Sequence, residues 1–308
     1  MKILVTEPDY FPEEAVNLLK NIGDVVCKKM DRKELLERIP EFDIIIARVD
    51  TAIDKNLIDR ANKLKIIATP ITGTNHIDME YVEKRGIKVI NAPGVNSNAV
   101  AEFTFGLILS LIRRIPQSSD SLNRGEWNRS KYIGNELKGK LVGIIGLGRI
   151  GSRIACLANS FGMNVYAYDK YVSEKDGKNI NACMTTLDDL LKKTDIITVN
   201  CILTDETKNM IDFKQFNMMK KGAILVNTSR GEVVNEEALL DALKSKKLYG
   251  AALDVFSQES ASNKLIEYAK NNENVIVTPH IAGSTEESML DASLLIVEKI
   301  KECVNNMK

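Results

Sequence analysis

Three side chains that can do acid–base and carboxylate-binding chemistry each follow a short apolar run. Arg230 follows AILVNTS, Glu259 lies shortly after AALDVF, and His280 ends NVIVTPH. A guanidinium can bind a carboxylate through two hydrogen bonds, and an imidazole exchanges protons near neutral pH. A carboxylate that is hydrogen-bonded to an imidazole raises the imidazole pKa and keeps its proton available. Each residue alone also suits an ordinary role, as a surface ion pair, a solvated loop acid or a strand-end histidine.

A glycine motif, Gly146-x-Gly148-x-x-Gly151, follows the apolar run LVGII and precedes a helical stretch. In a dinucleotide-binding βαβ unit these glycines allow a tight turn, close approach of the backbone to pyrophosphate, and close packing of helix on strand. The pyrophosphate would lie at the N-terminus of the helix that begins near Arg149, where free N–H groups favour an anion. The flanking strand and helix favour this interpretation over a glycine-rich turn without a ligand.

Asp169 ends the next apolar run, NVYAYD. It lies close to the roughly 20-residue distance at which an acid accepts hydrogen bonds from the adenosine ribose. A carboxylate suits a free 2′-hydroxyl and repels a 2′-phosphate, so the sequence predicts NAD rather than NADP. The neighbouring Lys170 leaves some tolerance for NADP open.

A nucleotide site of this kind gives the three strand-end residues a reaction. Hydride transfer to a ketone leaves negative charge on oxygen, which requires a nearby acid. His280 is predicted to be that acid, Glu259 to orient it, and Arg230 to hold a substrate carboxylate. The other histidine of the chain, His76, is expected to begin a helix and not to carry the reaction.

Strands and helices alternate along the chain, which predicts an α/β fold. Short runs rich in Val and Ile are separated by charged amphipathic stretches, as parallel βα units require. We expect two doubly wound parallel-sheet domains: a flavodoxin-like substrate domain, and a Rossmann NAD-binding domain with about six strands around Gly146. The last helix is expected to return to the first domain. The substrate domain would then comprise residues 1–95 and 285–308, and the nucleotide domain residues 96–284.

An apolar helix is predicted from about Asn98 to Arg114, followed by a polar, turn-rich segment to Lys140 that contains Trp127. The helix is too short to cross a bilayer and suits a buried connecting helix. It also suits contact with a second copy of the chain, and the segment after it is expected to lie over that copy. The hypothesis is a homodimer.

Composition excludes several classes of protein. The 308 residues are 44% hydrophobic, with 42 basic and 42 acidic side chains, so no nucleic-acid or membrane partner is expected. The five cysteines are scattered without a CxxC pair, which favours reduced thiols and argues against a metal site. The N-terminus does not read as a signal peptide, and no apolar run is long enough to span a membrane. A cytoplasmic protein is expected.

Four segments, LVGIIGLGRIG, LVNTSRGEVVNEEAL, ALDVF followed by Glu259, and TPHIAGST, resemble in order and spacing the NAD-dependent D-2-hydroxyacid dehydrogenases. Within that family, GTNHID, NAP and GEWNRSKYIGNELKGK are most similar to the D-3-phosphoglycerate dehydrogenases, in a short form without a C-terminal regulatory domain. The resemblance implies a hydride transfer between NAD and a small D-2-hydroxy or 2-keto acid, with 3-phosphoglycerate favoured.

The resemblance also implies roles for individual residues. The catalytic residues would be Arg230, Glu259 and His280. The cofactor would contact Gly146, Gly148, Arg149, Ile150, Gly151, Asp169, Thr207, Thr228, Asp254 and Gly283. Substrate would meet Arg48, Thr72, Gly73 and Asn96, and a partner subunit's substrate phosphate would meet Arg129.

Two departures from the family pattern concern loops. Ser260 follows Glu259 where the family usually has proline, and Asn200 and Ile202 replace residues that are common in the family near the adenine. Alternatives therefore stay open: a glyoxylate or hydroxypyruvate reductase, a D-lactate dehydrogenase, or an NAD-sensing protein that acts by recruiting partners, as corepressors related to this family do.

Overall fold

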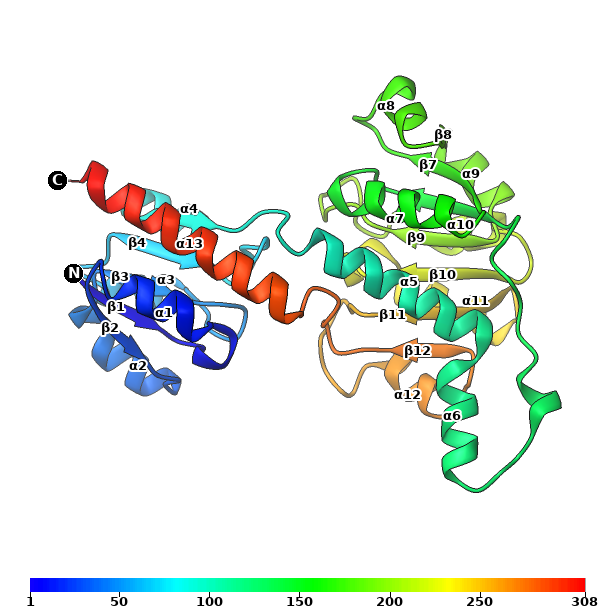
Figure 1. Cartoon of the computed structure of the whole chain (residues 1–308), viewed down its shortest axis with the longest axis horizontal. Coiled ribbons are helices and arrows are strands. Elements are labelled where there is room, and N and C mark those ends of the chain that lie inside the picture. Colours follow the sequence, from blue (N-terminus) through cyan, green and yellow to red (C-terminus); the bar gives the residue numbers. More distant parts are fainter. Residues whose placement is uncertain (308) are drawn as a thin grey trace. The chain divides into compact units, whose positions relative to one another are not determined.

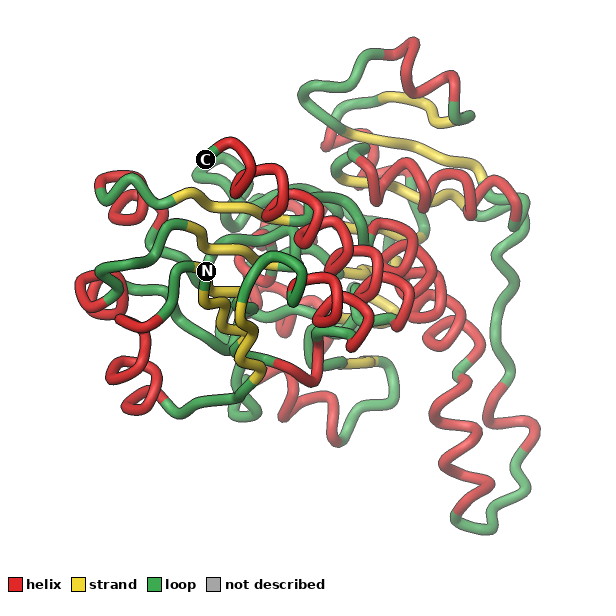
Figure 2. Tube along the Cα trace, turned by 60° about the vertical axis from the view of Figure 1, so that its left-hand side comes forward, coloured by secondary structure: helices red, strands yellow, loops and turns green. Residues whose placement is uncertain are grey.

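The computed structural model of the protein describes residues 1–307, and the chain divides into two compact units. Unit 1 contains Met1–Asn96 and Ser284–Lys308, and unit 2 contains Ser97–Gly283. Each unit has a parallel sheet with helices on both faces (Figures 1 and 2). The α/β prediction of two doubly wound sheets is confirmed. No helix among residues 1–307 is both long and apolar enough to cross a membrane.

The sheet of unit 1 has five parallel strands in the order β2-β1-β3-β4-β5, which is the flavodoxin-like order. The strands are β1 (Lys2–Val5), β2 (Asp24–Cys27), β3 (Ile44–Ile46), β4 (Ile66–Thr69) and β5 (Lys88–Asn91). The helices are α1 (Glu13–Leu19), α2 (Arg32–Arg38), α3 (Lys55–Arg60), α4 (Met79–Lys84) and α13 (Glu286–Asn306), with short 3₁₀ turns η1 (Pro8–Tyr10) and η2 (Ile39–Glu41).

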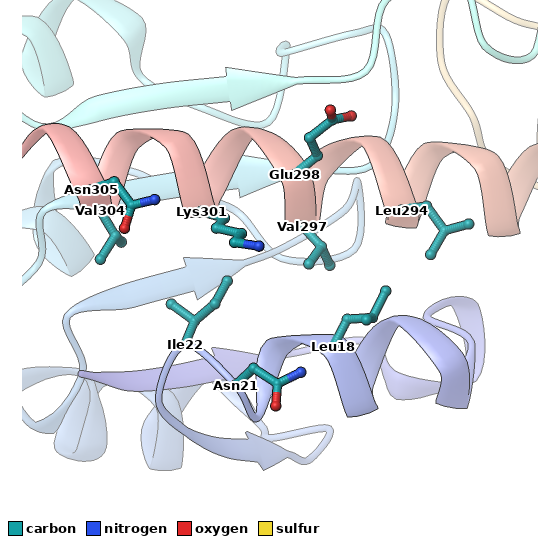
Figure 3. A pocket seen from close by; sticks show the side chains of 9 residues that line it. All are labelled: Leu18, Asn21, Ile22, Leu294, Val297, Glu298, Lys301, Val304 and Asn305. Carbon is teal, nitrogen blue, oxygen red and sulfur yellow. The ribbon is translucent and has the colours of Figure 1, made fainter.

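Alternate residues of the central unit 1 strands pack on opposite sides. Ile3 and Val5 contribute to a core with α1 and α13, whereas Leu4 between them packs in a second core with α2, α3 and α4. Both faces are apolar because both are covered, as parallel sheets require. A groove of about 350 Å³ remains between α1 and α13, where Leu18 and Ile22 face Leu294 and Val297 (Figure 3).

The sheet of unit 2 has seven parallel strands in the order β12-β11-β10-β9-β6-β7-β8. The strands are β6 (Leu141–Ile145), β7 (Asn164–Tyr168), β8 (Ala182–Met184), β9 (Ile196–Val199), β10 (Ala223–Asn227), β11 (Leu248–Leu253) and β12 (Val275–Val277). The expectation of about six strands is corrected to seven. The additional strand, β8, is a three-residue edge strand, too short to show a periodic apolar pattern.

Helices cover both faces of the unit 2 sheet. They are α5 (Ser97–Arg113), α6 (Ile115–Asn123), α7 (Arg149–Ser160), α8 (Glu174–Asn179), α9 (Leu187–Lys193), α10 (Phe213–Met218), α11 (Glu236–Lys244) and α12 (Lys264–Lys270), with 3₁₀ turns η3 (Arg129–Tyr132) and η4 (Gly231–Val233). The apolar side chains of α5 pack with α7 against one face, and α9, α10 and α11 contribute to the core on the other. The chain order in the sheet reverses between β9 and β6, and such a switch point is where open α/β sheets bind ligands.

Residues 115–140 are called the arm below, and Leu137, near their end, packs in the core with α5 and α7. In Figures 1 and 2, α6 and the loop after it project away from the sheet of unit 2. Glu273, in the loop before β12, forms ion pairs with Lys131 of the arm at 2.9 Å and with Arg114, directly before the arm, at 2.6 Å. The sequence predicted turns here, and the structure adds the helix α6.

Candidate functional site

The three predicted catalytic residues follow three neighbouring strands of unit 2. The last residues of β10 and β11 are paired in register, and the last residue of β11 is paired with that of β12. The strands therefore end at the same level (Figure 1). Arg230, Glu259 and His280 lie in the three segments that leave this edge.

The structure brings His280 and Glu259 into direct contact. His280 Nδ1 lies 2.6 Å from Glu259 Oε1, and the two side chains are 43% and 56% exposed. With the carboxylate as acceptor, Nδ1 is the donor, so Nε2 is the ring nitrogen left for another partner. The pair is thus an imidazole held by a carboxylate, with one nitrogen available to give or take a proton.

A buried carboxylate holds the turn that carries His280. The backbone of His280 has φ +54°, a left-handed conformation that costs a non-glycine residue about 1–3 kcal/mol. The fully buried Asp254 accepts hydrogen bonds from the Thr278 hydroxyl at 2.6 Å and from the N–H groups of Ile281 at 3.0 Å and Ala282 at 2.8 Å. The His280 N–H donates to the Asp254 carbonyl at 2.9 Å. Asp254 therefore fixes both sides of this turn.

The turn at Arg230 packs against the segment that leads to Glu259, but the Arg230 side chain does not hydrogen-bond to the other two catalytic candidates. Its guanidinium donates to the Ser229 carbonyl at 2.6 Å, and within residues 1–307 no hydrogen bond joins it to Glu259 or His280. A Cβ at Gly231 would lie 1.9 Å from the Phe256 carbonyl carbon. Glycine at this position is what lets the Arg230 turn pack against the segment that leads to Glu259.

Glu236, at the start of α11, organises the loop that contains Glu259. Its carboxylate accepts hydrogen bonds from the Ser257 N–H at 2.6 Å and from the Asn263 side chain at 2.8 Å. The sequence analysis missed this role. The only local signal is that Glu236 follows Asn235, the N-cap of α11, and that signal does not reveal a partner 21 residues away.

The backbone of the glycine loop needs glycine at two of its three glycine positions. Gly146 has φ +92°, and a Cβ there would lie 2.7 Å from the Cys201 nitrogen. A Cβ at Gly151 would lie 2.1 Å from the Gly146 carbonyl oxygen, whereas one at Gly148 would meet nothing within 4 Å. Two glycines are thus required by packing, and the third leaves open space at the N-terminus of α7. Arg149 is exposed there, and Ile150 is half-buried.

Asp169 is fixed beside this loop. Its two carboxylate oxygens accept hydrogen bonds from the N–H groups of Leu147 and Tyr171, each at 2.8 Å. The Gly146 N–H donates to the Tyr168 carbonyl at 2.8 Å, which joins the loop to the end of β7. Each carboxylate oxygen keeps lone-pair capacity for a further donor, such as a ribose hydroxyl.

The remaining cofactor candidates lie in the surrounding loops. Thr207 donates its hydroxyl to the Ile202 carbonyl at 2.7 Å and so shapes the loop after β9. Thr228 is buried with its hydroxyl 2.9 Å from that of Thr104, and so links the end of β10 to α5. Gly283 is half-buried at the end of unit 2.

The substrate candidates of unit 1 lie in loops after its strands. The Arg48 guanidinium lies 4.6 Å from the centroid of the Tyr10 ring. The backbone N–H of Arg48 donates to the buried Glu7 carboxylate at 3.0 Å. Burial raises the pKa of Glu7, against the hydrogen bonds it accepts from Arg48 and Thr51. The sequence analysis did not identify Glu7 or Tyr10.

Two further loops of unit 1 hold Thr72, Gly73 and Asn96. The Thr72 hydroxyl donates to the Ala92 carbonyl at 3.3 Å, and the Thr72 carbonyl accepts from the Asn91 side chain at 3.0 Å. The loops after β4 and β5 are therefore tied together. Gly73 and Asn96 are half-buried.

Arg129 and His76 lie in other segments of the chain. Arg129 lies in the arm, its guanidinium 5.5 Å from the centroid of the Trp127 ring. Burial lowers the pKa of His76, and a hydrogen bond with the Ala47 backbone opposes that shift. A histidine with a lowered pKa is less suited to donate protons.

The chain is similar to known proteins over most of its length. Residues 105–282 match the family model described as D-isomer specific 2-hydroxyacid dehydrogenase, NAD binding domain. The chain is 41% identical over 305 residues to a D-3-phosphoglycerate dehydrogenase of Methanocaldococcus jannaschii. The aligned residues cover 98% of this chain and 57% of that protein. The chain thus spans little more than half the length of that relative.

Two other relatives match over nearly their full length. A hydroxypyruvate reductase of Thermotoga maritima is 37% identical over 294 residues, 95% of each chain. The structure of a D-lactate dehydrogenase from Aquifex aeolicus complexed with NAD and lactic acid has a TM-score of 0.86 at 31% identity, covering 99% of this chain and 96% of that one. The chain therefore belongs to the D-isomer-specific 2-hydroxyacid dehydrogenase family and carries its NAD-binding domain.

Proposed function

We propose that the protein is an NAD-dependent oxidoreductase that interconverts a small D-2-hydroxy acid and its 2-keto acid. The observation that carries the proposal is the 2.6 Å contact between His280 Nδ1 and Glu259 Oε1 at the strand ends of an NAD-binding domain. This contact leaves Nε2 to exchange the proton of the substrate hydroxyl.

The residues of the chain would divide the work. When bound, NAD supplies the nicotinamide that accepts or donates the hydride. His280 would give a proton to the carbonyl oxygen in reduction and take it back in oxidation. Glu259 would hold the imidazole in one orientation, and Arg230 would bind the substrate carboxylate through its guanidinium.

We propose 3-phosphoglycerate and 3-phosphohydroxypyruvate as the substrate pair. The similarity to D-3-phosphoglycerate dehydrogenases supports this choice, as do the cations of Arg48 in unit 1 and Arg129 in the arm. Thr72, Gly73 and Asn96 would contact the rest of the substrate. A second candidate is hydroxypyruvate, because the Thermotoga maritima hydroxypyruvate reductase matches this chain over 95% of both lengths.

The test of the proton donor is the reduction of 3-phosphohydroxypyruvate, followed by the loss of NADH absorbance. His280→Ala should lower kcat by at least about 100-fold, because general acid catalysis contributes that much. NADH should still bind, since the glycine loop is untouched. A control is Glu267→Gln on α12, an exposed carboxylate paired with Lys270, which should keep full activity. Retention of most activity by His280→Ala would refute its role.

The substrate assignment has a separate test. The same assay with hydroxypyruvate, glyoxylate and pyruvate compares keto acids that lack the phosphate. A phosphate-binding enzyme should show a kcat/KM at least about tenfold higher for the phosphorylated acid, as expected for a charge-assisted contact. Equal or higher efficiency with hydroxypyruvate would favour the second candidate.

We also propose a homodimer formed through the arm. The apolar side chains of α5 are largely used inside unit 2, so this helix offers less to a partner than its sequence indicated. The arm instead exposes four large apolar side chains: Ile115, Leu122, Trp127 and Ile133. Clustered exposed apolar residues are typical of protein interfaces.

A further inference from the structure

An ion pair lies next to the acid that is placed for the adenosine ribose. Lys170, which directly follows Asp169, contacts both carboxylate oxygens of Glu206, at 2.8 and 2.7 Å. The partners are 36 residues apart and come from the loops after β7 and β9. Both side chains are exposed, 55% and 68%. Exposed pairs of this kind contribute little to stability, so stability does not explain the pair.

The charges at this edge decide which nucleotide it favours. NADP differs from NAD by a 2′-phosphate monoester, which carries about −1.5 to −2 charges at neutral pH. Asp169 repels that phosphate. Lys170 is the cation next in the chain, and a free ammonium there would attract the phosphate and offset part of the repulsion. The Lys170 ammonium already donates hydrogen bonds to the Glu206 carboxylate, and this interaction raises the pKa of Lys170.

We propose that Glu206 is a cofactor-specificity residue, which holds Lys170 away from a 2′-phosphate and so strengthens the preference of the protein for NAD over NADP. Asp169, Lys170 and Glu206 together carry one net negative charge, and replacing Glu206 by a neutral residue makes that sum zero. NAD has a hydroxyl at the 2′ position and gains nothing from a free ammonium. The inference rests on the NAD-binding domain and not on the identity of the keto acid.

The test is direct binding of NADH and NADPH to the whole protein by nucleotide fluorescence, without substrate. Glu206→Gln should tighten NADPH binding about three- to tenfold, because one opposing charge is removed at a solvent-exposed site. NADH binding should change less than twofold. The gain should shrink as salt is raised from 0.05 to about 0.5 M, because exposed charges are screened.

Two further variants identify the cause. Glu206→Gln combined with Lys170→Met should lose the gain for NADPH, since the ammonium is then absent. Asp205→Asn removes the same charge from the neighbouring residue, which makes no hydrogen bond or ion pair with Lys170 within residues 1–307, and should leave the NADH to NADPH ratio within twofold.

Three results would overturn the inference: unchanged NADPH affinity in Glu206→Gln, a gain that survives Lys170→Met, or an equal gain in Asp205→Asn. Failure of the substrate assignment would leave these affinities unaffected. Loss of NADH binding in Glu206→Gln would show instead that Glu206 contacts the nucleotide itself, and would also overturn the proposed role.

Discussion

At the scale of single residues, the site is set by a few polar side chains whose partners are fixed. The His280 ring contacts the Glu259 carboxylate, and the Glu206 carboxylate pairs with Lys170. Asp169 accepts hydrogen bonds from two backbone N–H groups. Each pairing restricts an orientation that the free side chain would not keep, and preorganised polar groups of this kind are what binding and proton transfer require.

Cys201 provides a chemical probe of the switch point between β9 and β6, because its backbone packs directly against Gly146. Burial raises the pKa of the Cys201 thiol to about 11. Only about 0.1% of this thiol is ionised at pH 8, roughly a hundredfold less than for an ordinary cysteine. We expect iodoacetamide to modify the exposed Cys156 and Cys183 well before Cys201, as measured by mass spectrometry of peptides.

The raised pKa of Cys201 also determines how the stability of the folded protein changes with pH. A thiol pKa raised in the folded state adds stability below the unfolded value near 9, and that contribution is lost as the pH rises through about 11. Protein unfolded in urea should show equal alkylation of all cysteines. Fast modification of Cys201 in the folded protein at pH 8 would contradict its half-buried position and its raised pKa.

At the scale of elements, strand ends and the turns after them decide the site. The turn from Thr278 to Ala282 follows the three-residue strand β12, and three hydrogen bonds to the Asp254 side chain hold it. The resemblance placed Asp254 near the nicotinamide. Its contacts within the chain are to the turn, and a contact with the cofactor stays a proposal.

The substitution Asp254→Asn tests how much this turn contributes to stability and to catalysis. The amide replaces one acceptor oxygen by an NH₂ group, which would face a backbone N–H in the fully buried site and leave it unsatisfied, at a cost of about 1–3 kcal/mol. We expect a melting temperature lower by several degrees and a kcat at least about tenfold lower, with a smaller change in NADH affinity. Asp188→Asn, at the exposed start of α9, should change the melting temperature by no more than about 1 °C. Unchanged kcat in Asp254→Asn would show that the turn holds His280 without this carboxylate.

At the scale of the whole molecule, the arm carries the proposal of a homodimer, and it contains the only tryptophan of the chain. Trp127 is 73% exposed. Burial against a second copy should shift its emission to shorter wavelength as the concentration rises through the range where sedimentation shows dimers. Ile133→Asp should move both transitions to higher concentration, because a charge in an apolar contact is costly.

A matched control lies outside the arm. Leu18→Asp places the same charge on an exposed apolar position of α1 in unit 1, and should leave the sedimentation of the dimer unchanged. A protein that sediments as a monomer at micromolar concentration, with constant Trp127 emission, would contradict the proposal.

The sequence by itself determined the family, the fold class and the residues most suited to the chemistry. The reason is that these depend on local patterns: apolar runs alternate with amphipathic ones, glycines recur at fixed spacing, and polar residues follow strands directly. In a parallel sheet the carboxyl ends of neighbouring strands meet at one edge, so Arg230, Glu259 and His280 could be grouped before their contacts were known.

Only the tertiary structure decided the contacts between residues far apart in the chain. Three such contacts join segments that are 21 to 36 residues apart. They are the packing of Gly231 against Phe256, the hydrogen bond from Glu236 to the loop of Glu259, and the ion pair of Lys170 with Glu206. The edge strand β8 likewise depends on its neighbour β7 for its hydrogen bonds. Such contacts arise from packing and leave no periodic signal in the sequence. The proposed role of Glu206 therefore depends on a contact with Lys170 that only the folded chain shows.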